Sequence, residues 1–245
     1  MTIKFILAQA INLSVIFLVN YITGLLVEKR NLKVNYSRKI NHFCLFFIPV
    51  FISIFINYSE NILSQIIGFI LETALIVILA KPFRERSKVL NTMFASFDRP
   101  EDRPYTLLWL ITQSMAGYII LVLLGYYFNY IGKSELILIP VLINGIGDGL
   151  AEPIGVRFGK HKYRTKGLFC KRYYERSVEG SLCVFIVSIL TVVLFFSSFS
   201  GLQFLLALLI LPPVMTLAEA LAPHTWDTPF LFLTAGLALG ILLLL

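Results

Sequence analysis

Apolar residues fill eight long stretches of the chain, and short polar segments separate them. The stretches lie near residues 3–27, 40–57, 61–80, 105–128, 134–156, 179–197, 200–221 and 228–245. An apolar stretch of about 20 residues is long enough for a helix to cross the hydrocarbon core of a bilayer. The pattern therefore predicts an all-α fold, a polytopic integral membrane bundle of about 7–8 transmembrane helices with no soluble domain. We expect residues 1–245 to form a single transmembrane domain.

The composition agrees with this fold class. Of the 245 residues, 58% are hydrophobic and 14% are charged, whereas soluble domains carry about 25% charged residues. The net charge of +7 does not imply nucleic acid as a partner, because basic residues also set membrane topology and meet anionic lipid. Cys44, Cys170 and Cys183 have no metal-like spacing, so the sequence predicts neither a disulfide nor a zinc site.

Basic residues are concentrated in alternate loops. Five, six and eight Lys and Arg residues lie in the segments 28–39, 81–104 and 157–178, respectively. Only Lys4 and Lys133 lie elsewhere. The positive-inside rule places the three basic loops in the cytoplasm. Both termini, and short turns such as 57–60, are then expected outside.

Acidic residues in or beside the apolar stretches are candidates for chemistry, because carboxylates at membrane depth are costly and commonly functional. Five of them are expected at similar depth near the cytoplasmic face: Asp148, Glu152, Glu179, Glu219 and Asp227. Asn144, Asp148 and Glu152 follow one helix face at a spacing of four residues. A buried polar patch that joins helices would show the same spacing, so that both interpretations stay open.

The loop 157–176 lies beside these carboxylates and is rich in Gly, Lys and Arg. Its basic residues are Arg157, Lys160, Lys162, Arg164, Lys166, Lys171, Arg172 and Arg176. Topology and lipid headgroups alone would also explain a basic loop. However, Arg176, Ser177, Glu179 and Gly180 place a base, a hydroxyl and a carboxylate at a helix N-terminus, where N–H groups attract phosphate. Carboxylates beside such a loop suit a divalent metal and the phosphates that it bridges.

Asn144 and Glu152 are also weak candidates for contacts with a substrate or a lipid headgroup, as are four further polar residues. Glu72 lies in the middle of the third stretch, and Arg38, Lys39 and His42 lie at the start of the second. A hydrogen bond between helices explains Glu72 equally well. Snorkelling of the side chain toward the headgroups explains His42 equally well.

Several motifs together resemble the polyprenol kinase family, which includes dolichol kinase, phytol kinase and the CTP-dependent diacylglycerol kinase. They run in order from 38 to 229: residues 38–42 (RKINH), 147–149 (GDG), 155–162 (GVRFGKHK), 176–181 (RSVEGS) and 217–223 (LAEALAP), before Asp227. The central block is also similar to CDP-diacylglycerol synthase. The late Glu219-Ala220-Leu221-Ala222-Pro223 segment favours the kinases.

The resemblance implies a membrane lipid-alcohol kinase, a transferase that moves a phosphoryl group from a nucleoside triphosphate to a lipid hydroxyl at the cytoplasmic face. It implies a polyprenol, a phytol-like alcohol or diacylglycerol as substrate, and CTP as donor, with ATP or UTP as alternatives. Mg²⁺ or Mn²⁺ would be the cofactor. The catalytic core is expected over residues 134–229. The sequence indicates no oligomeric state.

In this hypothesis each group of candidates has a role. Asp148 and Glu179 bind the metal, and Glu219 and Asp227 are further ligands or the base toward the lipid hydroxyl. Phosphates would be held by Arg157, Lys160, Lys162, Arg176, Ser177 and Gly180.

Two other functions remain open on the sequence. A cytidylyltransferase acting on phosphatidate or a prenyl phosphate would use the same metal and triphosphate. A non-enzymatic lipid transporter would place polar sites near the midplane, where only Glu72 lies among the acidic candidates.

Overall fold

The computed structural model describes residues 2–56 and 62–245. It is 79% helical, which confirms the all-α, membrane-like class. The chain divides into two compact units, Met1–Ile111 and Thr112–Leu245. The expectation of a single transmembrane domain stays a prediction. The turn 57–60, predicted to face outward, lies outside the described residues.

The first unit is built from helices that follow one another with short connections. They are α1 (Ile3–Arg30), α2 (Val34–Phe55), α3 (Ile62–Val77), α4 (Lys81–Arg84), α5 (Lys88–Ala95) and the 3₁₀ turn η1 (Pro100–Asp102). Gly24 lets α1 approach α5, because a Cβ there would lie 1.9 Å from the Thr92 carbonyl oxygen. Between α1 and α2, Thr23 Oγ1 donates to Asn41 Oδ1 at 2.9 Å. Small residues and interhelical hydrogen bonds are what joins helices in a bilayer, where apolar burial between helices adds little.

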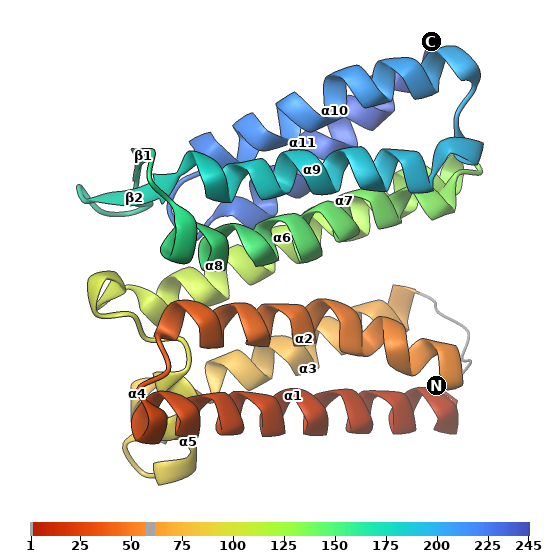
Figure 1. The fold of residues 1–245 in the computed structure, drawn as a ribbon. Helices are drawn as coiled ribbons and strands as arrows, with labels where there is room; N and C mark the ends of the chain where they lie inside the picture. The colour runs from red at the N-terminus through yellow and green to blue at the C-terminus, as the bar shows by residue number, and fades with distance from the viewer. Residues whose placement is uncertain (1, 57–61) are drawn as a thin grey trace. The chain divides into compact units, whose positions relative to one another are not determined.

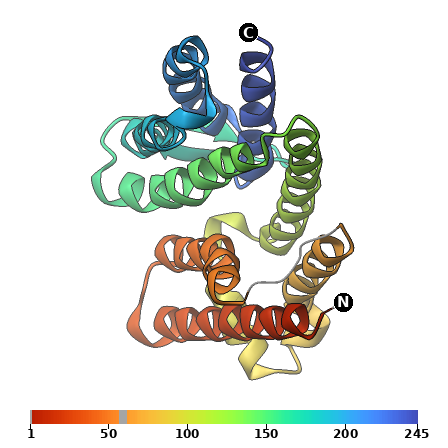
Figure 2. The ribbon, with the colours of Figure 1, turned by 90° about the vertical axis from the view of Figure 1, so that its right-hand side faces the viewer.

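The second unit holds the remaining elements. They are α6 (Thr106–Tyr130, which begins in the first unit), η2 (Ser134–Ile137), α7 (Leu138–Leu142), η3 (Ile143–Asp148), α8 (Gly149–Phe158), β1 (Lys162–Lys166), β2 (Tyr173–Ser177), α9 (Val178–Leu194), η4 (Phe196–Ser198), α10 (Gly201–Leu221) and α11 (Asp227–Leu242). Figures 1 and 2 show α9 alongside α10, and α10 also packs against α11. The β1–β2 hairpin lies at the end of this unit where α8 ends and α9 begins (Figure 1).

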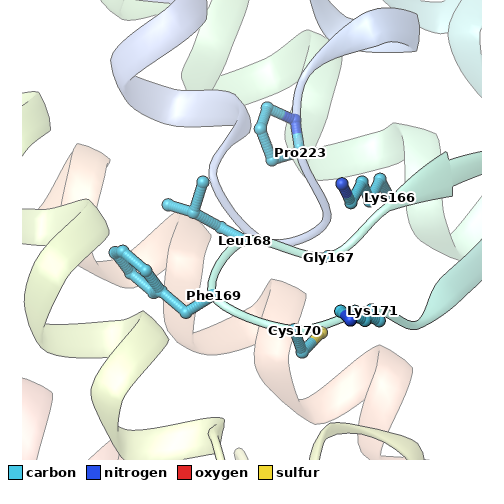
Figure 3. Close-up of a pocket in the computed structure, with 7 residues that line it drawn as sticks. All are labelled: Lys166, Gly167, Leu168, Phe169, Cys170, Lys171 and Pro223. Atoms are coloured by element: carbon cyan, nitrogen blue, oxygen red, sulfur yellow. The ribbon is translucent and has the colours of Figure 1, made fainter.

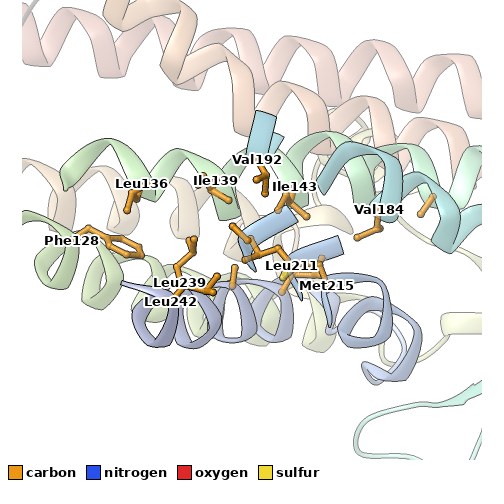
Figure 4. Close-up of a cluster of buried hydrophobic side chains, with 14 residues drawn as sticks. Phe128, Leu136, Ile139, Ile143, Val184, Val192, Leu211, Met215, Leu239 and Leu242 are labelled. Carbon is orange, nitrogen blue, oxygen red and sulfur yellow. The ribbon is translucent and has the colours of Figure 1, made fainter. Parts of the chain in front are cut away.

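The core of the second unit is apolar and closely packed (Figure 4). Its fully buried members come from α6 to α11 and include Phe128, Ile139, Ile143, Val184, Val192, Leu211, Met215 and Leu239. By contrast, Leu123, Leu190 and Leu209 are well exposed on helices of the same unit. Apolar side chains on both the inside and the outside of a helical unit are expected where lipid is the solvent.

The local sequence sets where α10 begins and ends. Ser200 and Gln203 form a capping box at its start, which satisfies two backbone N–H groups. Pro223 lies one residue beyond the C-cap Ala222, where it cannot continue the helix. Glu219 is therefore fixed in the last turn of α10, near the start of α11.

All eight predicted apolar stretches coincide with helical segments in the described residues. By length and composition, five helical segments there can cross a membrane: Ile3–Arg30, Val34–Phe55, Thr106–Tyr130, Ser134–Phe158 and Gly201–Leu221. Three shorter apolar helices cover Leu63–Val77, Val178–Leu194 and Asp227–Leu242. The long apolar helices indicate an integral membrane protein, whereas the count of seven to eight crossings stays a prediction.

Two parts of the second unit differ from a simple sequence of straight helices. The predicted span 134–156 is broken into η2, α7, a π-helical turn (η3) and α8. The predicted loop 157–176 contains most of an antiparallel hairpin, with Lys162 opposite Ser177 and Lys166 opposite Tyr173. The alternation of exposed and less exposed side chains along β1 is the period of two that a strand requires.

Candidate active site

A buried arginine joins two of the predicted carboxylates at the end of the second unit. Arg176 Nη1 on β2 lies 2.7 Å from Glu219 Oε1 on α10, and the two side chains are 11% and 5% exposed. Arg176 also donates to the backbone carbonyl of Glu219. Its Nη2 lies 3.6 Å from Asp227 Oδ2 in the first turn of α11. The hairpin strand β2 and the consecutive helices α10 and α11 therefore converge on one guanidinium group.

A chain of hydroxyl groups reaches the same carboxylate from the other side. Ser181 Oγ lies 2.7 Å from Glu219 Oε2, and Tyr163 Oη lies 2.6 Å from Ser181 Oγ. An ionised carboxylate only accepts hydrogen bonds, and a hydroxyl has a single proton to donate. Ser181 therefore donates to Glu219, in preference to the more distant Ser177 carbonyl at 3.3 Å, and Tyr163 donates to Ser181. The chain of hydrogen bonds runs in one direction, from Tyr163 to Glu219.

The surroundings of the Arg176 guanidinium and of the Tyr163 hydroxyl keep each of these groups in one protonation state. Burial lowers the pKa of Arg176, but the carboxylates of Asp227 and Glu219 outweigh it, so the net pKa is raised. Asp148 also raises the pKa of Arg176, by a smaller amount, so its carboxylate acts electrostatically on the guanidinium. Burial raises the pKa of Tyr163, and the negative charge of Glu219 raises it further. Arg176 is thus a permanent cation, and Tyr163 a permanent donor at neutral pH.

Glu179 lies in a second cluster, at the start of α9. Its carboxylate accepts from the backbone N–H of His161 at 3.2 Å and lies 2.8 Å from the Nδ1 atom of the same residue. Val178 N donates to the His161 carbonyl at 3.0 Å. Glu179 is only partly buried, so this carboxylate has an open side toward solvent.

Glycines bring α8 against the start of α9. Ser177 caps α9 and accepts from Gly180 N at 3.1 Å. A Cβ at Gly155 would lie 2.7 Å from Ser177 Oγ, and one at Gly180 would lie 2.6 Å from the Ala151 carbonyl oxygen. Real Cβ atoms do not come this close, so both positions need glycine for packing.

The predicted residues of the broken helix lie on and after its π turn. Asp148 is 3% exposed and Asn144 is fully buried on η3, and Glu152 follows half-buried on α8. Gly147 places this turn against α9, because a Cβ there would lie 3.1 Å from Val184 Cα. Single π turns inside helices are frequent at functional sites.

The carboxylates fit a metal that arrives with a nucleotide better than a metal held by the protein alone. Within residues 2–56 and 62–245, no group of three or more His, Cys, Asp or Glu side chains has the arrangement of a metal site. Mg²⁺ in nucleotide sites is commonly held by one or two carboxylates, with waters and substrate phosphates as the other ligands. Asp148 and Glu179 lie on elements that pack together, and their role as such a pair of oxygen donors stays a prediction.

The predicted phosphate-binding bases divide between the surface and the interior. Arg157, Lys160 and Lys162 are exposed near the start of the hairpin, and the two lysines flank His161 in the sequence. Arg176, in contrast, is turned inward to Glu219.

Four of the weak substrate or headgroup candidates belong to the first unit, where each has a contact or a buried position. Arg38 Nη1 lies 3.2 Å from Asp102 Oδ2. The His42 ring lies 4.7 Å from the Phe46 ring, and Lys39 is buried. Glu72 accepts from Asn12 Nδ2 on α1 at 3.3 Å. These contacts are structural, and contact with a substrate or headgroup stays a prediction.

Three residues of the site were given no role in the sequence analysis: Tyr163, and Ser181 and His161, which lie within the quoted motifs. Tyr163 could have been found from the alternation along 162–166, because every second side chain of a strand shares one face. Ser181 lies one helical turn after the cap Ser177. No pattern in the sequence indicated the contact between His161 and Glu179.

Comparison with known proteins gives one informative similarity. The chain is 32% identical over 98 residues to a phytol kinase of Synechocystis sp.. The matched region covers 40% of this chain and 38% of that protein. No family model and no solved structure matches. This partial similarity supports a relation to the polyprenol and phytol kinases, and it does not extend to the whole of either chain.

Proposed function

We propose that this chain is a membrane lipid kinase that transfers a phosphoryl group from a nucleoside triphosphate to a lipid alcohol. The observation that carries the proposal is the convergence of Arg176, Glu219 and Asp227 at one end of a helical unit. The ordered motifs and the partial similarity to a phytol kinase support it. Among lipid alcohols we favour a phytol-like or polyprenyl chain, and as donor CTP.

Phosphoryl transfer depends mostly on positioning and on neutralising the charge of the phosphates. The exposed Lys160 and Lys162 precede the N-terminus of α9, where the helix dipole also favours phosphate. These groups would hold the triphosphate. Mg²⁺, when bound, would neutralise phosphate charge, and Asp148 and Glu179 would hold it.

The two remaining carboxylates differ in their contacts and therefore in the role we assign. Both oxygens of Glu219 are engaged, one by Arg176 and one by Ser181. We therefore assign Glu219 to positioning Arg176, which is one of the predicted phosphate-binding residues. Asp227 has a longer contact of 3.6 Å with Arg176 and a more exposed side chain. Asp227 is therefore the better candidate for the base that accepts the proton of the lipid hydroxyl.

The site lies at the end of the unit that carries the basic hairpin. Under the positive-inside rule this end faces the cytoplasm, where nucleotides are available, and both termini lie outside. The lipid alcohol would enter from the bilayer with its hydroxyl at this interface.

The test is to supply the purified full chain with Mg²⁺ and labelled CTP or ATP, and in separate assays with phytol, polyprenols, diacylglycerol, phosphatidate or a prenyl phosphate. Transfer of γ-label to lipid is the expected result. Transfer of α-label to phosphatidate or a prenyl phosphate would instead identify a cytidylyltransferase, which the similarity of the central block to CDP-diacylglycerol synthase makes the second candidate. Transport of lipid without metal or nucleotide turnover would contradict both enzymes.

A further inference from the structure

The hairpin divides the basic loop into two separate groups. Lys160 and Lys162 lie at its base, and Lys166 and Lys171 lie at its tip. Lys162 and Lys166 lie four positions apart on the strand, a distance of about 13 Å at the usual rise per residue. The tip lysines therefore lie outside the group proposed for the triphosphate.

The tip is held against the loop between α10 and α11. His224 N donates to the Lys166 carbonyl at 3.0 Å, and Gly167 forms a bridge with His224. The His224 ring stacks on the Tyr174 ring with centroids 3.7 Å apart. A Cβ at Gly167 would lie 2.8 Å from Tyr174, so the tip fits only with glycine there. The tip is thus part of the surface of the second unit.

This tip forms a pocket of about 360 Å³ with basic and apolar walls. It is lined by Lys166, Gly167, Leu168, Phe169, Cys170, Lys171 and Pro223 (Figure 3). Figure 3 shows the two lysine side chains on one side of the tip and Leu168 and Phe169 on the other. From Lys160 to Tyr174 the chain contains no acidic residue. The pocket therefore suits a ligand that combines a negative charge with an apolar part.

The side chain of Phe169 is exposed, and its backbone has a left-handed conformation. Its φ is 61° and it is 60% exposed, although a bulky side chain disfavours left-handed backbone. Thr225, in the segment that faces the tip, has a φ of 64°. Strained residues are retained mostly where the position of the chain serves a function.

The tip contacts Trp226, which lies at the start of α11. The Phe169 ring meets the Trp226 ring edge-on, with centroids 6.4 Å apart. Trp226 directly precedes α11, and its Nε1 donates to Thr112 Oγ1 on α6 at 3.1 Å. Tryptophan is enriched at the boundary between membrane and water, which is also the depth of the phospholipid headgroups.

We propose that the tip, residues 166–171, binds an anionic phospholipid of the surrounding bilayer. Lys166 and Lys171 pair with its phosphate, and Leu168 and Phe169 enter the boundary with the acyl chains. Two lysines beside apolar side chains at membrane depth complement an anionic headgroup on an acyl chain. The proposal requires insertion in a membrane but not the kinase activity.

The experiment measures retention of lipid by the full chain. Protein purified with phosphatidylglycerol and phosphatidylcholine is examined by native mass spectrometry for the bound phospholipid. For the double variant Lys166→Gln/Lys171→Gln we expect roughly tenfold weaker retention of phosphatidylglycerol, because each lysine near the surface contributes to binding. The control Lys29→Gln/Lys88→Gln removes two exposed lysines of the first unit and should change retention by less than about twofold.

Three results would overturn the proposal. One is an equal loss of retention in both double variants, which would show a general effect of charge. Another is equal retention of phosphatidylcholine and phosphatidylglycerol. The third is displacement of the lipid by free phosphate or CTP, which would identify a soluble phosphate as the ligand. Absence of kinase activity would leave the lipid result unaffected.

A second variant separates lipid binding from folding. Phe169→Gly removes the ring and relieves the left-handed strain. If Phe169 serves the membrane boundary, this variant retains less phosphatidylglycerol while its melting temperature stays the same or rises. A lower melting temperature with unchanged lipid retention would show that the ring is only structural.

Discussion

Arg176 and Glu219 lie 43 residues apart in the sequence, and their side chains meet at 2.7 Å in a region almost closed to solvent. Removing one member of a buried ion pair leaves the other charge without its partner, which costs about 3–5 kcal/mol. Arg176→Met should therefore lower the melting temperature strongly and abolish activity. Arg164→Met, on the exposed face of the same hairpin, should change stability by less than about 0.5 kcal/mol.

Arg176→Lys tests the geometry of the pair and not only its charge. An ammonium group is a compact cation, whereas the guanidinium presents two nitrogens to two carboxylates. We expect the Lys variant to fold, with a modest loss of stability and a loss of activity of at least about tenfold. Thermal melting in detergent and label transfer to lipid measure the two effects. Full activity in Arg176→Lys would show that a positive charge is sufficient and that the geometry of the guanidinium is not required.

Tyr163→Phe removes the first donor of the hydroxyl chain and leaves Ser181 bonded to Glu219. The loss of one hydrogen bond should cost about 1 kcal/mol of stability. We expect kcat to fall with little change in KM, because Glu219 then holds Arg176 less firmly. Tyr173→Phe is the matched control, since Tyr173 lies exposed on the same hairpin. Equal kinetics in the two variants would argue against a role in catalysis for the hydrogen-bonded hydroxyls of Tyr163 and Ser181.

The glycines between α8 and α9 give a prediction about packing. A Cβ at Gly180 would lie 2.6 Å from the Ala151 carbonyl oxygen, and Gly125 on α6 has open space around it. Gly180→Ala should destabilise the protein by about 1–3 kcal/mol through overpacking, and it should reduce activity by moving Glu179. Gly125→Ala should leave both unchanged. A Gly180→Ala variant with normal melting would show that the helices can separate without cost.

The helices of this fold follow from hydropathy, because an apolar stretch of sufficient length has few alternatives to a helix in a bilayer. The hairpin was missed because positive charge dominates the loop and hides the alternation that turns Tyr163 and Arg176 inward. The position of the π turn could not be predicted either, because a π turn has no simple sequence period. Gly147, Gly149 and Pro153 disfavour a regular helix in this stretch, but they do not specify a π turn.

The candidate site was predictable as a set of residue types but not as a set of contacts. Spacing and membrane depth selected Asp148, Glu179 and Glu219 as acids near one face. They did not show that Glu219 would be occupied by Arg176 and Ser181, or that Glu179 would pair with His161. Such pairings depend on how α9, α10 and the hairpin pack, which no local pattern encodes.

Substitution of Asp148 tests the proposed metal site. Asp148→Asn keeps the shape and much of the hydrogen bonding of the side chain and removes the charge that would neutralise Mg²⁺. Because Asn has nearly the same size and shape as Asp, it should fit the packed interior where Asp148 is 3% exposed, and we expect little change in melting temperature. We expect transfer of γ-label to fall by orders of magnitude, with partial recovery when Mn²⁺ replaces Mg²⁺. Glu152→Gln, one helical turn away, is the control and should remain active. If Asp148→Asn is fully active and Glu152→Gln is not, Glu152 is the metal ligand and the assignment of Asp148 is wrong.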